Sequence, residues 1–336
     1  MKAAIYAGKG GPITLEDLPD PEPGEGEVVI RVHRCGICGT DLSMTQGKVF
    51  DFGHGQFGHE YAGEIVALGK GVDSLRLGQK LSVNPSGACG HCLGCAGHNH
   101  VMCRNAPSAA QGFAEYAKFP ANLAVPLPDT LSMADGALIE PLAVSLYGVR
   151  QSGLQRGQTV LVLGGGTVAL YAIYWARVMG AGRIVAMSRS MRRKDLCLAM
   201  GADAFVTFGP DEVGEVSELL GGAPDLILEC AGAEGMMAKA LMHAKVYGKV
   251  ISLGFCTSPD PFMPAMAAYK CVTMQFLVGY GMDEFLTIAR QMDRGHVDPK
   301  AIITNTVSLI DLPDTMAMLR GANTETKVHV LCGSGA

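Results

Sequence analysis

The order of hydrophobic and polar residues changes character part-way along the chain. In the first third, short alternating runs such as 27–32, 64–68 and 114–119 are separated by Gly and Pro, a pattern typical of half-buried strands. From about residue 155, apolar strands, glycine turns and longer amphipathic helices repeat. The candidate strands of this repeat are 159–163, 183–187, 204–207, 225–229 and 249–253. Strands that alternate with helices predict a parallel, doubly wound sheet, whereas the first third predicts an irregular, barrel-like β domain.

The repeat ends near residue 280. A helix at 283–294 and a last strand at 327–331 do not continue it, and they could return to the first domain. A chain of 336 residues is too long for one ordinary core and suggests two domains. We therefore predict a β-rich domain of residues 1–145, an α/β domain of residues 146–279 and a C-terminal return of residues 280–336.

Composition and charge narrow the classes of function. The net charge of -5 and pI near 6.0 give no general electrostatic reason to bind a nucleic acid or an anionic membrane. No stretch approaches the roughly 20 apolar residues that cross a bilayer. Residues 1–6 run straight into a strand pattern without the features of a secretory signal, so we expect a soluble, cytoplasmic protein.

Cysteine spacing supplies the first chemical signal. Four of the eleven cysteines have the spacing C-x2-C-x2-C-x7-C, namely Cys89, Cys92, Cys95 and Cys103. Four thiolates can close a tetrahedral shell around one zinc ion, and a closed shell organises a loop rather than doing chemistry. The rival ligands in the same segment are His91, His98 and His100. The alternatives are four unliganded thiols or a zinc-ribbon binding module without catalysis, which would predict a basic face and no cofactor turn.

A second set of metal-binding residue types lies upstream. The run C-G-I-C-G-T-D starts at Cys35, and G-H-E ends at Glu60, so that Cys38, His59 and Glu60 offer a thiolate, an imidazole and a carboxylate. Each piece alone is a weak signal, because a lone histidine is more often structural and a lone cysteine is usually a small core residue.

A glycine turn follows the apolar run 160–163. Residues 164–169 fit G-x-G-x-x-A between a predicted strand and a predicted helix, the context that a dinucleotide-binding turn requires. Gly164 would permit the tight turn and Gly166 would let the backbone approach a pyrophosphate, while the helix that opens at Thr167 and Val168 offers unpaired N–H groups. The alternative is a plain loop.

The end of the next strand bears on the choice of cofactor. Ser188 stands where an acidic residue would bind the ribose 2'-hydroxyl of NAD. Arg189 and Arg193 follow, and guanidinium groups attract a 2'-phosphate. The sequence thus predicts NADP(H) in preference to NAD(H), the alternative being a solvated, basic helix start.

In this order, the motifs at Cys35, His59, Cys89 and the glycine turn resemble the zinc-containing medium-chain dehydrogenase/reductase family. The sorbitol dehydrogenase and secondary alcohol dehydrogenase branches are the most similar, and residues 139–143 and Lys327 match as well. The resemblance implies a GroES-like catalytic domain, a Rossmann cofactor domain and an active site between them. It also implies two zinc ions per chain, one catalytic and one structural.

The resemblance further implies the roles of individual residues. Cys38, His59 and Glu60 correspond to catalytic zinc ligands, and Glu140 fills a place where relatives use a cysteine or an acid, either directly or through water. Cys35 corresponds to a structural residue. The bound zinc would act as a Lewis acid on an alcohol or a carbonyl, and Lys327 would belong with the cofactor-binding residues.

The proton path and the substrate are less determined. Thr40 matches the position that hydrogen-bonds the substrate oxygen, and Ser43 stands where several relatives carry a relay histidine, so that Ser43, His54 or water could continue the path. In sorbitol dehydrogenases an arginine contributes to the polyol pocket, and Gly279, beside Tyr280, stands there in this chain. The apolar residues near the predicted mouth are Met44, Phe50, Phe52 and Phe57.

These features favour an apolar or cyclic secondary alcohol and its ketone, or an aldehyde, as the substrate. A sorbitol-like polyol dehydrogenase is the first alternative. A zinc-free reductase of quinones or enoyl groups would lack Cys38, His59 and the four clustered cysteines. By resemblance we expect a homotetramer, with a dimer as the alternative.

Overall fold

The computed structural model describes residues 1–48, 53–106, 108–295 and 298–333. It divides into two compact units: unit 1 comprises Met1–Ala143 and Tyr280–Ala336, and unit 2 comprises Val144–Gly279. The predicted limit at residue 145 differs by two residues, because α4 (Ile139–Ser152) runs from one unit into the other. Phe50 and Phe52 lie outside the described residues.

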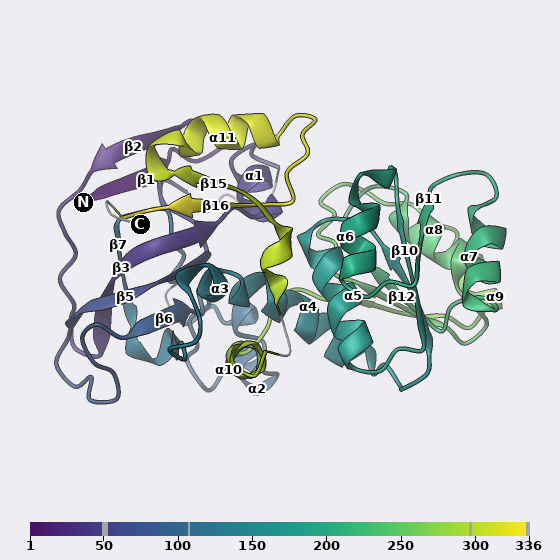
Figure 1. Ribbon diagram of the computed structural model, residues 1–336, viewed down its shortest axis with the longest axis horizontal. Coiled ribbons are helices and arrows are strands. Elements are labelled where there is room, and N and C mark those ends of the chain that lie inside the picture. Colours follow the sequence, from purple (N-terminus) through teal and green to yellow (C-terminus); the bar gives the residue numbers. More distant parts are fainter. Residues whose placement is uncertain (49–52, 107, 296–297, 334–336) are drawn as a thin grey trace. The chain divides into compact units, whose positions relative to one another are not determined.

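Unit 1 is built mainly of strands (Figure 1). Its strands are β1 (Lys2–Tyr6), β2 (Ile13–Asp17), β3 (Glu27–Gly36), β4 (Gly55–Gln56), β5 (Glu60–Leu68), β6 (Lys80–Val83), β7 (Tyr116–Pro120), β8 (Ala124–Pro126), β15 (Ile303–Ser308) and β16 (Lys327–Leu331). Its helices are α1 (Gly39–Met44), α2 (Leu93–Ala96), α3 (Met133–Ala137), α10 (Met282–Asp293) and α11 (Leu312–Leu319), together with the first residues of α4.

The larger sheet of unit 1 joins the two ends of the chain. Its order is β15-β16-β3-β5-β6-β8, with β7 also paired to β3. The C-terminal segment therefore returns to the first domain, as expected. Alternating residues such as Val28, Ile30 and Val32 are fully buried in one continuous core, as a strand with one apolar face requires.

Strand register brings three distant segments together near the end of β3. Gly36 is opposite both Glu60 of β5 and His329 of β16. A Cβ on Gly36 would lie 2.1 Å from Oε2 of Glu60, so that only glycine fits at this crossing. Cys38, just after β3, and His59, just before β5, are thereby placed close to the same point.

Unit 2 is an α/β layer structure. Its strands are β9 (Thr159–Leu163), β10 (Arg183–Ser188), β11 (Ala204–Thr207), β12 (Leu226–Glu229), β13 (Lys249–Ser252) and β14 (Thr273–Phe276). Its helices are the remainder of α4, α5 (Thr167–Val178), α6 (Lys194–Ala199), α7 (Glu212–Leu220), α8 (Met236–His243) and α9 (Pro264–Tyr269).

The sheet of unit 2 is parallel throughout, in the order β11-β10-β9-β12-β13-β14. The order reverses beside β9, and ligands of such sheets bind at the carboxyl ends of the strands at this reversal. Strands β9 and β11 have the predicted bounds, and β10 extends one residue further, to Ser188. Among the residues that the structure describes, none of the helices combines the length and apolar character needed to span a bilayer.

Candidate metal and cofactor sites

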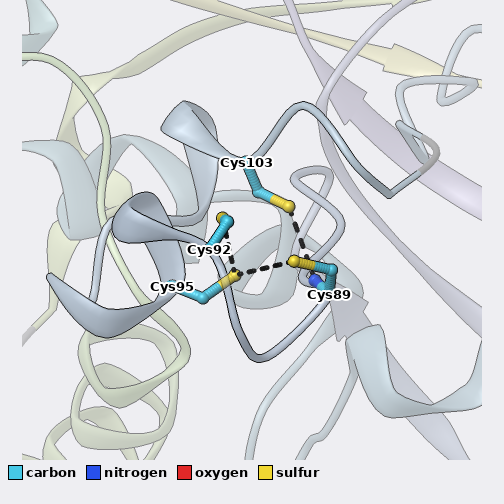
Figure 2. Close-up of side chains that lie close together, drawn as sticks. All are labelled: Cys89, Cys92, Cys95 and Cys103. Carbon is cyan, nitrogen blue, oxygen red and sulfur yellow. Dashed lines mark hydrogen bonds between the residues drawn. The ribbon is translucent and has the colours of Figure 1, made fainter.

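The four-cysteine group consists of Cys89, Cys92, Cys95 and Cys103, whose sulfur atoms all lie within 4.8 Å of one another. Figure 2 shows the four side chains turned toward a common centre. The Sγ atoms of Cys89 and Cys95 are 3.9 Å apart, and those of Cys92 and Cys95 are 3.6 Å apart. A zinc tetrahedron with Zn–S bonds of about 2.3 Å has S–S edges of about 3.8 Å. The sulfur positions therefore fit one zinc ion.

Backbone amides point at these sulfurs. The N–H of Cys89 donates to Sγ of Cys103 at 3.4 Å. A hydrogen bond from the amide of His91 lowers the pKa of Cys89 to about 6, and one from the amide of Asn105 lowers the pKa of Cys103. Amide donors favour the thiolate form, which is the form that binds zinc.

A tight local backbone places the cysteines. Helix α2 carries Cys95 after Cys92 at its N-cap, and a Cβ on Gly94 would lie 2.8 Å from the carbonyl carbon of Met102. Two of the rival histidines have other partners: Nδ1 of His91 lies 2.9 Å from the carbonyl oxygen of Cys89, and Nδ1 of His100 lies beside the amide nitrogen of Asn84. None of the three predicted rival histidines is a member of the group.

The open group consists of Cys38, His59 and Glu60, whose ligand atoms also lie within 4.8 Å of one another. Cys38 is the N-cap of α1 and Glu60 is the first residue of β5. A thiolate, an imidazole and a carboxylate form a donor set suited to zinc that leaves a coordination position open. The structure thus brings together the three predicted ligands, although Cys38 is far in the sequence from the adjacent His59 and Glu60.

Asp41 holds two members of the open group, a role that the sequence analysis did not assign. One carboxylate oxygen accepts from the amide of Cys38 at 2.9 Å, and the other lies 3.2 Å from Nδ1 of His59. Burial alone would lower the pKa of His59, but the Asp41 carboxylate and Cys38 raise it well above its ordinary value. A carboxylate behind a histidine fixes the orientation of the ring and makes it a better metal ligand. The capping-box spacing of Cys38 and Asp41 was the available signal.

Lys327 lies with the open group in unit 1, and its contact with a cofactor stays a prediction. Its Nζ donates to both carboxylate oxygens of Glu60, at 2.7 and 2.6 Å, and to the carbonyl of Ile37 at 3.0 Å. The Lys327 and Glu60 side chains are only 2% and 1% exposed. The reason is topological: β16 pairs with β3 beside Gly36, which directs Lys327 to Glu60.

Glu140 lies beside the open group rather than within it. Burial is the main cause that raises its pKa, to about 7, and the charge of Glu60 adds to this, while His59, a hydrogen bond with Tyr280 and Lys327 lower it. Burial raises the pKa of Tyr280 well above its ordinary value, and the charge of Glu140 adds to this. The predicted extra ligand is therefore close enough to interact electrostatically with His59 and Glu60, and Tyr280, which also acts on it, was not predicted as a site residue.

Two of the predicted proton-path residues, Thr40 and Ser43, lie on α1. The amide of Thr40 donates to Sγ of Cys38 at 3.5 Å, and Ser43 is half-buried on the same helix. His54 is exposed. Cys35 is fully buried in the core and is not a member of the open group.

Two residues predicted near the substrate mouth are core residues instead. Met44 and Phe57 are each only 5% exposed and belong to the hydrophobic core of unit 1. The ring of Phe57 packs edge-on against Phe113, at 5.0 Å between centroids. These two positions therefore give no support for an apolar substrate pocket.

The glycine turn lies at the carboxyl end of β9 in unit 2. Gly164 has a φ of +124°, and a Cβ there would lie 3.2 Å from the backbone of Ala231 and Cys230. Gly166 is the N-cap of α5, and a Cβ on it would meet nothing within 4 Å. The turn thus combines a strained, close-packed glycine with open space at the start of the helix that contains Thr167 and Val168, as a dinucleotide pyrophosphate requires.

The candidate 2'-phosphate residues border this turn. A Cβ on Gly165 would lie 3.1 Å from Cβ of Arg193 and 3.5 Å from Oγ of Ser188. Arg193 is 9% exposed, whereas Arg189 is exposed. The structure therefore brings Ser188 and Arg193 to the glycine turn.

Comparison with known proteins agrees with this geometry. The "Alcohol dehydrogenase GroES-like domain" family matches residues 24–129, and the "Zinc-binding dehydrogenase" family matches residues 167–294. The chain is 30% identical to (R,R)-butanediol dehydrogenase of Bacillus subtilis over 334 residues, which cover 93% of this chain and 94% of that protein. It is 29% identical to sorbitol dehydrogenase of Bacillus subtilis over 333 residues, which cover 94% and 92%.

A solved structure extends the comparison to three dimensions. A zinc-binding dehydrogenase from Sinorhizobium meliloti, bound to NADP, has a TM-score of 0.89 and 29% identity, with 98% of each chain covered. The expected combination of a GroES-like domain and a Rossmann domain is confirmed.

Proposed function

Because the chain belongs to the zinc-dependent medium-chain dehydrogenase/reductase family, we propose that it is an NADP-preferring alcohol dehydrogenase. It transfers a hydride from a small secondary alcohol to NADP, which yields the ketone, or it runs this reaction in reverse. An aldehyde is the other carbonyl compound proposed. The convergence of Cys38, His59 and Glu60 within 4.8 Å carries the proposal, because this donor set suits catalytic zinc.

The residues in and around the open group have different proposed roles. Cys38, His59 and Glu60 would hold the metal, and Asp41 orients His59. When bound there, zinc supplies a Lewis acid for the alcohol or carbonyl oxygen. The Thr40 hydroxyl, on the helix that Cys38 caps, accepts the alcohol proton and passes it toward Ser43 or water. Glu60 stays paired with Lys327, which keeps its buried negative charge compensated.

The preference for NADP rests on unit 2. Ser188 stands at the end of β10 in place of an acidic residue, so that no carboxylate at this position repels a 2'-phosphate. Arg193 lies against the same glycine turn, and Arg189 is exposed beside it. Guanidinium groups form strong, charge-assisted hydrogen bonds with phosphate oxygens. The NADP bound to the Sinorhizobium meliloti relative is in keeping with this preference.

Zinc content and cofactor titration test the proposal on the same sample. We expect about two zinc ions per chain, falling toward one in Cys38→Ser, because one site is closed and one is open. NADPH should bind more tightly than NADH until Arg189 is replaced by Ala. Unchanged zinc in Cys38→Ser would contradict the catalytic-metal assignment, whereas equal binding of NADH and NADPH would contradict only the cofactor preference.

The substrate is proposed as an apolar or cyclic secondary alcohol, because Gly279 stands where sorbitol dehydrogenases carry an arginine. A polyol or vicinal diol is the second candidate, favoured by the similarity to the butanediol and sorbitol enzymes. Rates with cyclohexanol, 2-butanol, 2,3-butanediol and sorbitol separate the two. A kcat/KM for sorbitol or 2,3-butanediol above that for cyclohexanol would favour the second candidate. The proposed homotetramer can be checked by light scattering.

A further inference from the structure

The carboxylate of Glu229 ties together the ends of two neighbouring strands in unit 2. Glu229 is the last residue of β12 and is 1% exposed. Its Oε1 accepts from the amides of Ala231 and Gly232, at 2.7 and 2.8 Å. Its Oε2 accepts from the hydroxyl of Ser252, the last residue of β13, at 3.0 Å. One buried carboxylate thus fixes both the turn that follows β12 and the end of the next strand.

The backbone of the two loops packs closely around this carboxylate. The amides of Leu253 and Gly254 donate to the carbonyl oxygen of Glu229, at 2.7 and 3.0 Å. A Cβ on Gly254 would lie 2.6 Å from Oε2 of Glu229. Gly232 has a φ of +58°, and a Cβ there would lie 2.7 Å from the amide nitrogen of Phe255. The loops after β12 and β13 therefore meet backbone to backbone, with Glu229 between them.

These loops lie at the carboxyl ends of the strands, across β9 from Ser188, because β9 separates β10 from β12. The amide of Cys230 donates to the carbonyl oxygen of Leu163 at the end of β9, at 2.8 Å. A Cβ on Gly164 would lie 3.2 Å from the amide nitrogen of Ala231. A dinucleotide lies across such a reversal of strand order, with its adenosine ribose at the end of β10. The nicotinamide half then falls to the loops after β12 and β13.

The glycine turn itself is held from the other side. The amide of Gly164 donates to the carbonyl oxygen of Met187 on β10, at 2.8 Å, and Arg193 lies against Gly165. Loss of the Glu229 carboxylate should therefore loosen the loops after β12 and β13, while the glycine turn and its β10 side stay in place.

We propose that Glu229 is a positioning residue for the cofactor, and that its carboxylate holds the loops after β12 and β13 in the shape that receives the nicotinamide half. The inference rests on the proposed function, because that function brings a dinucleotide to this edge of the sheet. Loops that are already ordered bind a ligand without a further entropic cost of ordering. They also fix the orientation of the reacting ring, which a small displacement would spoil.

Glu229→Ala tests this role, because it removes both acceptor oxygens. Calorimetry measures the binding of NADPH and of adenosine 2',5'-bisphosphate, which carries the adenosine half without the nicotinamide half. We expect NADPH to bind at least about 10-fold more weakly, which is the worth of one hydrogen bond to a charged group. The bisphosphate should bind with the wild-type affinity. Glu229→Gln keeps an acceptor oxygen for the two amides and should recover most of the loss.

Asp225 supplies the matched control at the opposite end of the same strand. It directly precedes β12, and its Oδ2 accepts from the amide and the hydroxyl of Thr159, at 2.7 and 3.0 Å. Asp225→Ala should lower the free energy of unfolding and leave the affinity for NADPH unchanged. The positioning role is overturned if Asp225→Ala weakens NADPH as much as Glu229→Ala does. It is also overturned if Glu229→Ala binds NADPH like the wild type, or loses the bisphosphate to the same extent as NADPH.

Ser252→Ala keeps the test decisive if Glu229→Ala folds poorly. It leaves the carboxylate in place and removes the hydroxyl that donates to Oε2, so that NADPH should bind more weakly and the bisphosphate as in the wild type. The wild-type affinity for NADPH in a folded Ser252→Ala protein would overturn the role. Failure of the proposed function would be visible separately, as a wild-type protein that binds neither NADPH nor NADH.

Discussion

The two metal-ligand groups of unit 1 are built in opposite ways. The four-cysteine group takes all its ligands from one segment, 89–103, and local turns and amide donors hold its half-buried sulfurs. The open group takes its ligands from the start of α1 and the start of β5, and its charges are balanced by Asp41 on α1 and by Lys327 on the distant strand β16. A closed site can be made locally, whereas an open site needs the whole unit to compensate its buried charge.

The largest effect is expected when the four-cysteine group loses a ligand. Cys92→Ser removes one of four thiolates from a structural site whose zinc is worth about 10–16 kcal/mol in isolated zinc-finger peptides. We expect the loss of one zinc ion per chain and of more than about 5 kcal/mol locally, seen as rapid proteolysis within 89–103. Cys256→Ser in unit 2 is the control, and resistance of both variants to proteolysis would contradict the local role of zinc.

The second prediction tests the open group through the buried ion pair of Lys327 and Glu60. Lys327→Met leaves the Glu60 carboxylate buried without its cation, which should cost about 3–5 kcal/mol in the free energy of unfolding. Urea denaturation measures this cost. Lys2→Met is the matched control, because Lys2 pairs with Asp17 on the surface, and an exposed pair is worth at most about 1 kcal/mol. Equal losses in the two variants would mean that burial of the Lys327 pair is energetically unimportant.

The third effect concerns the support behind His59. Asp41→Asn keeps the size of the side chain but removes the charge that faces Nδ1, and we expect the open group to retain zinc about 10–100-fold less well. Competition with a chelator measures this change. The four-cysteine zinc should be unaffected, and Asp20→Asn, at an exposed position, should match the wild type in both sites.

The smallest effect is a dependence of stability on pH. His329, on the same strand as Lys327, is fully buried, and neither ring nitrogen has a hydrogen-bond partner within the described part of the chain. Burial is the main cause that lowers its pKa to about 3, and Lys327 and Arg34 act in the same direction. Because the folded pKa lies below the ordinary value of 6.5, the unfolded chain binds the extra proton. The stability that the neutral ring contributes is present above pH 6.5 and is lost as the pH falls toward 3.

Between pH 7 and pH 5 this loss amounts to about 2 kcal/mol. Urea denaturation of wild type and of His329→Leu at the two pH values isolates it. The variant should lose about 2 kcal/mol less than the wild type over this interval, and His54→Leu, at an exposed position, should behave as the wild type. Parallel losses in all three proteins would show that His329 is not the source.

The four-cysteine group and the glycine turn could be predicted from the sequence because the residues of each lie in one short segment. The spacing of the four cysteines predicted one cluster, and the run 160–169 predicted a strand, a turn and a helix, all of which the structure contains. The resemblance to a known family added Cys38, His59 and Glu60, which spacing alone would have left as weak signals.

The remainder of the site depends on contacts between distant parts of the chain. The pairing of Lys327 with Glu60 could not be predicted, because it arises only from the register of β16 on β3. Tyr280 comes close to Glu140 through packing that no local pattern encodes. Met44 and Phe57 were expected at the substrate mouth, but an apolar residue in a loop has the same sequence signal whether it lines a pocket or fills a core.

The discontinuous course of unit 1 also has a consequence for protein synthesis. Unit 2 is one uninterrupted stretch, whereas β16 must pair with β3 after all of unit 2 has been translated. On the ribosome, domains generally fold as units in the order in which they emerge. The Glu60 carboxylate therefore has no Lys327 partner until the C-terminal segment has been synthesised, and the open group is among the last parts of the chain to fold.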